Sequence, residues 1–293
     1  MSTTEPLSTD KLLGPRILRK ISGNGFSVQL AEYPAGHRQK WHSHNHHGIS
    51  FLISGGIRER VRRSEESAVP FSLVIKPAEV SHCDWVGPRG ARLVQVKFEE
   101  DCQLWPDSSI DAPQDWRWLH KGPALREMVS LLALLLSNSS IANTVAEEEI
   151  VNLLTGVTDI EAAAPGPAPT WLHAIKQQLD DTPQALLSVR QLADQAGVHA
   201  VYLSRAFRRY YGTSITQYRK RARFCLAAAT LSGSGNNLCE IAHACGYTDH
   251  AHFCRDLRAL TGSRPSSIRD LLYRVSSVQE KHSRAHLELA TIE

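Results

Sequence analysis

The stretch LSVRQLADQAGVHAVYLSRAFRRYYGTSITQYRKRAR, residues 187–223, recurs in altered form as CEIAHACGYTDHAHFCRDLRALTGSRPSSIR, residues 239–269. Both copies contain an alanine, a glycine four residues later, and then an apolar residue, an arginine, a second apolar residue and a second glycine. The alanine and the first glycine recur after 49 residues, and each later position recurs after 50. This internal repeat predicts two copies of one helical unit.

The shared positions predict a pair of helices joined by a glycine turn. Ala193 and Ala242 are small enough for two helices to cross closely, and the glycines that follow them allow the positive φ that ends a helix. Each second helix then has two apolar residues four positions apart, which bury one of its faces. These pairs are Leu203 with Phe207 in the first copy and Phe253 with Leu257 in the second.

The opposite face of each second helix is polar and basic. It carries Val201, Ser204, Arg205 and Arg208 in the first copy, and Ala251, Cys254, Arg255 and Arg258 in the second. An arginine on such a face can donate two hydrogen bonds to one guanine or clamp a phosphate, and small neighbours let the helix enter the major groove. A helical repeat with arginines in solvent is the alternative, and the matched positions of two copies disfavour it.

Charge is distributed unevenly along the 293 residues, although the net charge is only +3. Residues 170–293 contain 16 Lys and Arg against 10 Asp and Glu, whereas residues 1–169 contain 17 against 20. A basic part joined to a mildly acidic part is typical of a nucleic-acid-binding domain attached to a separate module. The length suits two domains, and the hydrophobic share of 42% suits a globular protein.

Targeting and cysteine signals are weak. The first residues, MSTTEPLSTDK, lack the basic and apolar regions of a signal peptide, and no apolar run approaches the length of a membrane span. The six cysteines contain no C-x-x-C pair, which argues against a zinc ribbon and a disulfide framework. We therefore expect a cytoplasmic protein.

The repeated segment resembles the DNA-binding domain of AraC/XylS-type transcription regulators over about 105 residues, and Gly246-Tyr247 and the G-x-x-P at 262–265 are marks of that family. The resemblance implies two helix-turn-helix units bridged by a long helix, with both recognition helices on one face of the DNA. It also adds His250 to the expected DNA contacts. Two residues depart from the family pattern: His199 replaces an N-capping serine, and Leu257 replaces a phenylalanine.

The N-terminal part alternates short β-rich runs with Gly/Pro turns, which predicts a sandwich or barrel. The runs are Phe26–Leu30, Ile49–Ile53, Ile57–Val61, Phe71–Ile75 and Arg92–Phe98. This segment also resembles a cupin barrel. It keeps Gly36, His42, His44 and Gly55 of the first cupin pattern and Pro77 and His82 of the second, but has Gly48 for a glutamate, Glu79 for a glycine and Val86 for an asparagine.

Six of the 14 histidines lie between residues 37 and 82. His42, His44 and His82 could converge and bind Zn²⁺, Ni²⁺ or Fe²⁺, since neutral imidazole suits all three metals. The missing glutamate counts against a metal, although Asp84, His46 or His47 could replace it. A metal-free pocket for a small-molecule effector and a solvated polar loop are the alternatives.

Residues 125–136 place apolar side chains at helical spacing, and Leu131 and Leu134 widen the apolar face. This face predicts either packing on the barrel or a homodimer contact through residues 123–154. The Pro/Ala-rich segment after it predicts a linker that leaves the DNA-binding domain free. The expected parts are an arm (1–20), the barrel (21–120), the helices (121–160), the linker (161–169), the DNA-binding domain (170–275) and a tail (276–293).

The predicted fold is therefore α+β with two domains: a cupin-like β-barrel with following helices, and an all-α double helix-turn-helix domain. The leading interpretation is a DNA-binding transcription regulator that senses an effector, with promoter DNA and RNA polymerase as partners and no enzymatic activity. A metal-dependent cupin enzyme fused to a DNA-binding module is one alternative. A constitutive DNA-binding dimer is the other.

Overall fold

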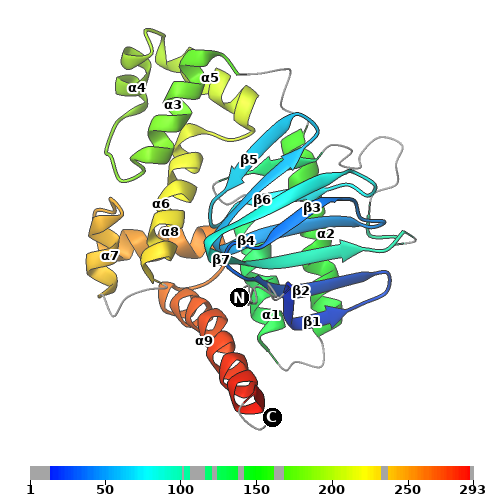
Figure 1. Ribbon diagram of the computed structural model, residues 1–293. Coiled ribbons are helices and arrows are strands. Elements are labelled where there is room, and N and C mark those ends of the chain that lie inside the picture. The colour runs from blue at the N-terminus through cyan, green and yellow to red at the C-terminus, as the bar shows by residue number, and fades with distance from the viewer. Residues whose placement is uncertain are drawn as a thin grey trace, which may run out of the picture.

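The computed structural model describes residues 14–100, 102–105, 116–120, 124–137, 142–161, 168–231 and 237–290, without the side chains of 157–161 and 278–290. An antiparallel β-domain and two helices are followed by an all-helical part (Figure 1). This arrangement confirms the predicted fold class. Most of the predicted linker lies outside the described residues, and no helix among those described combines the length and apolar character needed to cross a bilayer.

The β-domain is one antiparallel sheet of eight strands in the order β1-β2-β7-β4-β6-β8, with β3 paired to β7 and β5 paired to β4. The strands are β1 (Arg16–Ser22), β2 (Phe26–Tyr33), β3 (Arg38–His42), β4 (His47–Val61), β5 (Ser64–Ala68), β6 (Leu73–Lys76), β7 (His82–Phe98) and β8 (Arg117–Leu119). Because β1 begins at Arg16, the predicted arm of residues 1–20 is too long.

The long strands β4 and β7 bend where glycines remove steric limits. The register of β4 against β7 shifts around Gly55, whose φ is +83° and whose added Cβ would lie 1.9 Å from the carbonyl oxygen of Gly90. Only glycine fits there. The bend divides the sheet into one part with β1, β2, β6 and β8 and another with β3 and β5.

Side chains alternate between the two faces of this sheet. One face carries Leu30, Phe51 and Val94, which are fully buried in a core shared with the following helices α1 (Leu125–Leu135) and α2 (Ala142–Glu161). The other face carries polar residues such as Gln29 and Gln95, whose amides are hydrogen-bonded to each other at 2.7 Å. The polar face is where the candidate ligand site lies.

The widened leucine face of α1, on which the homodimer contact was predicted, is buried within this chain. Leu131 is 0% exposed and Leu134 is half-buried against the same core. Helix α1 contacts β2 on one side and α2, α8 and α9 on others, and together these surfaces cover the leucines. The packing alternative is therefore correct for this face.

The helical part comprises two units joined by α6 (Figure 1). Its helices are α3 (Thr170–Asp181), α4 (Val189–Gln195), α5 (Ala200–Tyr211), α6 (Ile215–Leu231), α7 (Leu238–Ala244), α8 (His250–Thr261) and α9 (Pro265–Ala290). Helix α9 continues through the residues predicted as a tail. The first unit has a core of its own, with Leu192, Leu203 and Phe207 fully buried.

The second unit shares the core of the β-domain and α1, contrary to the expectation of a free DNA-binding domain. Phe224 of α6 meets Phe71 edge-to-face with ring centroids 5.3 Å apart. Arg126 of α1 donates to the carbonyl oxygen of Ala259 at 3.5 Å, and Arg274 of α9 donates to that of Leu136. The composition of the linker could not predict this docking, because the contacts are made by residues of α1, α6, α8 and α9, which lie outside the linker.

Candidate nucleic-acid interface and candidate metal site

Each helix-turn-helix unit begins with a capping box. The side chain of the N-cap residue accepts from the backbone N–H three residues later, and the side chain of that later residue accepts from the backbone N–H of the N-cap residue. In the first unit Ser188 accepts from Gln191 at the start of α4, and in the second Asn237 is paired with Glu240 at the start of α7. The glycine after α7, Gly246, has φ +79° and an added Cβ would lie 2.5 Å from the carbonyl oxygen of Gln184. The turn is therefore fixed both by conformation and by close packing.

Helices α5 and α8, which are the predicted recognition helices, present the predicted faces. The described side chains Val201, Ser204, Arg205 and Arg208 of α5 are exposed, as are His250, Ala251, Arg255 and Arg258 of α8, while Cys254 is half-buried. The opposite faces bury Phe207 and Phe253 completely. The structure thus brings the predicted DNA-contacting residues onto two solvent-facing helices.

His199 caps α5, although it stands where the family pattern has a serine. Its backbone is extended and its Nδ1 accepts from the N–H of Val201 at 3.3 Å. Asp249 caps α8 in the same manner and accepts from the N–H of His252 at 2.7 Å. The departure from serine at residue 199 therefore preserves the cap.

Sequence reasoning missed the residues that hold the recognition helices in place. Arg223 of α6 is buried and donates to the carbonyl oxygen of Pro183 at 2.9 Å, which ties α6 to the segment before α4. Asp256 on the buried side of α8 accepts from Lys220 of α6 at 2.8 Å. A charged residue at a buried helical position was the available signal, because such groups are paired when buried.

In the β-domain the structure brings together the three predicted histidines. The ring centroids of His42 and His82 are 4.2 Å apart, and those of His44 lie 4.9 Å from His42 and 5.2 Å from His82. One nitrogen from each ring lies within 4.8 Å of the others. His42 and His44 come from the end of β3 and the turn after it, and His82 begins β7.

The hydrogen bonds of His42 and His82 leave one nitrogen of each ring with a lone pair at the centre of the histidine cluster. Nδ1 of His42 lies 2.8 Å from the carbonyl oxygen of Lys40, and Nδ1 of His82 lies 3.1 Å from that of Val80. A carbonyl oxygen only accepts, so each Nδ1 carries the proton and each Nε2 is an acceptor. Both Nε2 atoms are buried without a hydrogen-bond partner. This is the tautomer that binds a metal.

Burial also favours the neutral form of His44 and His82. Desolvation, with the neighbouring histidines and Lys76, lowers the pKa of His44 to about 3. Desolvation and Lys76 lower the pKa of His82 to about 4. Neutral imidazole is the form that coordinates a cation, so the electrostatics fit a metal.

Of the three residues proposed to replace the missing glutamate, Asp84 is the one best placed. Its Oδ2 lies 3.8 Å from Nε2 of His82, and its Oδ1 is buried without a partner. The ring of His47 is instead stacked on Trp105 with centroids 4.5 Å apart, and its Nδ1 accepts from the N–H of Ala78, so His47 is not free to replace it. The ring of His46 lies 5.0 Å from that of His44.

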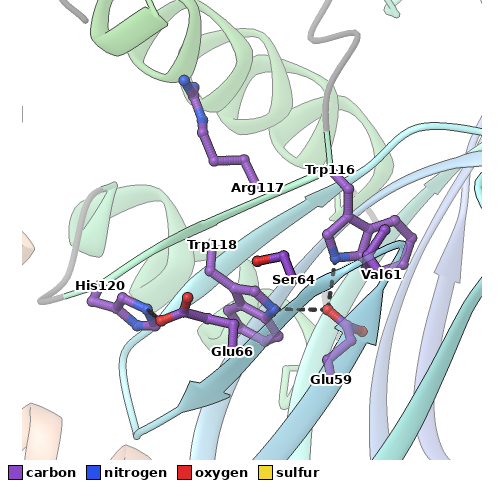
Figure 2. Close-up of a pocket in the computed structure, with 8 residues that line it drawn as sticks. All are labelled: Glu59, Val61, Ser64, Glu66, Trp116, Arg117, Trp118 and His120. Atoms are coloured by element: carbon purple, nitrogen blue, oxygen red, sulfur yellow. Dashed lines mark hydrogen bonds and ion pairs between the residues drawn. The ribbon is translucent and has the colours of Figure 1, made fainter. Parts of the chain in front are cut away.

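Beside the histidines lies a buried ion pair that the sequence interpretation did not include. Glu59 is 1% exposed and accepts from Nζ of Lys76 at 2.6 Å. It also accepts from the indole N–H groups of Trp116 and Trp118 at 2.7 Å each (Figure 2). Burial raises the pKa of Glu59 while Lys76 opposes that shift. Burial alone would lower the pKa of Lys76, but Glu59 and Asp84 outweigh it and raise the pKa.

One family model matches a segment of the helical part. A helix-turn-helix domain profile matches residues 192–270. The uncharacterized regulator YijO of Escherichia coli is 30% identical over 97 residues, 33% of this chain and 34% of its own length. The regulator RipA of Corynebacterium glutamicum is 31% identical over 111 residues, 38% and 33% of the two chains. The chain thus matches about a third of the length of these relatives.

Solved structures show weaker likeness. ToxT of Vibrio cholerae aligns over 85% of this chain and 98% of its own at 10% identity, with a TM-score of 0.36. Oxalate decarboxylase of Bacillus subtilis aligns over 26% and 21% at 15% identity, with a TM-score of 0.24. These scores are too low to support an argument, so the domain assignment rests on the profile, the curated relatives and the paired helices. Residues 192–270 of the chain therefore match a helix-turn-helix domain.

Proposed function

We propose that this protein is a sequence-specific DNA-binding transcription regulator whose β-domain receives an effector. The observation that supports the proposal best is the pair of recognition helices, α5 and α8, each with an exposed arginine at the matched position of the repeat. The curated relatives are named as transcriptional regulators and activators, which agrees with this role. Docking of the second unit on α1 provides a physical connection between a ligand in the β-domain and α8.

Arg205→Ala and Arg255→Ala should each weaken binding to a specific DNA site by about 1–3 kcal/mol. The reason is the loss of a two-donor contact to a base, and the affected base positions should lie about one helical turn (~10 bp) apart. The measurement is full-length protein titrated onto a DNA fragment selected by that protein from a random pool. Arg63→Ala, exposed in the turn between β4 and β5, is the matched control. Equal weakening on all sequences would instead make the arginines phosphate contacts.

We also propose that the β-domain, which is cupin-like in its sequence pattern, binds a divalent cation through His42, His44 and His82. The buried, unpartnered Nε2 atoms of His42 and His82 support this site, and Asp84 provides a nearby carboxylate. The bound cation would supply charge and ligand coordination next to the polar interior. A regulator is favoured over a cupin enzyme because Gly48 occupies the position of the glutamate in the cupin pattern.

Protein purified from metal-supplemented medium should contain close to one equivalent of divalent metal, and His82→Ala should remove it. Elemental analysis and the melting temperature measure both effects, because a metal bound only by the native state stabilises it. His47→Ala is the control, since that ring faces Trp105. Wild-type protein without metal, or metal retained by His82→Ala, would contradict the site.

A further inference from the structure

A pocket of about 290 Å³ opens on the polar side of the β-domain (Figure 2). It lies next to the histidine site. It is formed by β4, β5 and the segment 116–120, and is lined by Glu59, Val61, Ser64, Glu66, Trp116, Arg117, Trp118 and His120. The Trp116 ring separates it from the histidines, with its centroid 4.2 Å from that of His82. Its volume is near the lower end for small-ligand pockets, which limits an occupant to a small molecule.

The walls of this pocket are aromatic. Trp116, Trp118 and His120 follow one another at alternate positions, and the rings of Trp118 and His120 are parallel with centroids 6.2 Å apart. The indole N–H groups of both tryptophans are directed to Glu59, which fixes the orientation of the rings. Indole faces are electron-rich and attract a cation placed over them.

The charged groups of the pocket favour a cation as well. The carboxylate of Glu59 is already paired with Lys76, so Glu66 is the carboxylate of the pocket that is left for a ligand, and Figure 2 shows the Arg117 side chain extending away from it. Glu66 accepts from Nε2 of His120 at 2.8 Å, and this hydrogen bond lowers the pKa of Glu66. Glu66 therefore remains a carboxylate at neutral pH, and the hydrogen bond orients the His120 ring beside it.

Nζ of Lys76 already lies 4.6 Å from the centroid of Trp116, so Trp118 is the indole left for a ligand. We infer that the pocket binds a small organic cation, an amine or ammonium compound, held over Trp118 and paired with Glu66. The claim that this cation is the effector rests on the proposed function. The claim that the pocket binds a cation depends only on the pocket itself. Glu65, the neighbour of Glu66, points to the outer face and pairs with Arg60 at 2.6 Å. The two adjacent glutamates thus provide a matched test.

The test is calorimetric titration of the full-length protein, without DNA, with choline, with ethanolamine, and with the neutral isostere of choline in which carbon replaces nitrogen. At least one cation should bind and raise the melting temperature, and the neutral isostere should bind about tenfold more weakly or not at all. Glu66→Gln should weaken the cation about tenfold, since a charged partner is lost. Glu65→Gln should leave its affinity unchanged.

Trp118→Leu should also weaken the cation, and far-ultraviolet circular dichroism checks that each variant is folded. Binding of neither cation, equal binding of the neutral isostere, or equal losses in Glu65→Gln and Glu66→Gln would overturn the inference. DNA binding is measured separately without ligand. Failure of that measurement alone would contradict the proposed function and leave the binding site intact.

Discussion

Glu59→Ala should lower the free energy of unfolding of the β-domain by about 3–5 kcal/mol. The substitution leaves the ammonium group of Lys76 buried without its 2.6 Å partner and removes the acceptor of two indole N–H groups. An unpaired charge in a low-dielectric interior is far costlier than an unpaired charge in water. Urea denaturation followed by circular dichroism and by fluorescence, to which Trp116 and Trp118 contribute, measures the change.

Two further variants identify the cause of this loss. Glu59→Leu combined with Lys76→Met removes both charges, and should recover most of the stability because the desolvation cost disappears with the pair. Glu65→Ala breaks the surface pair with Arg60, and should cost under about 1 kcal/mol because water screens it. A double variant as unstable as Glu59→Ala would show that the indole contacts, rather than the charge of Lys76, dominate.

The recognition helices could be predicted from the sequence because their signals are local. The apolar pairs four residues apart and the turn glycines lie within one helix or one turn of each other, as for Leu203 with Phe207. The repeat then supplied a second, independent copy of each position. The repeat could not predict how α6 is attached to the two helix-turn-helix units. The partners of Lys220 and Arg223 lie 36 and 40 residues away in the sequence.

The histidine site could also be predicted from the sequence, because each of its three histidines matches a position of the short cupin patterns. The Glu59 network could not be, since its partners Lys76, Trp116 and Trp118 lie 17 to 59 residues away and meet only through strand pairing. A signal was nevertheless present in the strand IRERV. Ile57, Glu59 and Val61 alternate with two arginines, which places the glutamate on the inner face of β4.

The leucines of α1 show where composition misleads. A wide apolar face indicates that several surfaces must cover it, but it does not say whether they belong to one chain or two. Here β2, α2 and the second helix-turn-helix unit all contact α1 within the same chain. The second helix-turn-helix unit comes from segments more than a hundred residues later, as the hydrogen bond between Arg274 and Leu136 illustrates.

Leu131→Glu should therefore unfold the chain or lower its stability by at least about 5 kcal/mol, because it loses core packing and buries an unpaired carboxylate. Leu131 is 0% exposed, whereas Leu134, one turn away, is half-buried. Leu134→Glu should cost roughly 1 kcal/mol, since its carboxylate can reach water. Urea denaturation measures both, and sedimentation gives the oligomeric state. A folded, monomeric Leu131→Glu from a dimeric wild type would restore the α1 face as an interface between chains, because a residue buried only by a partner can be charged without unfolding its own chain.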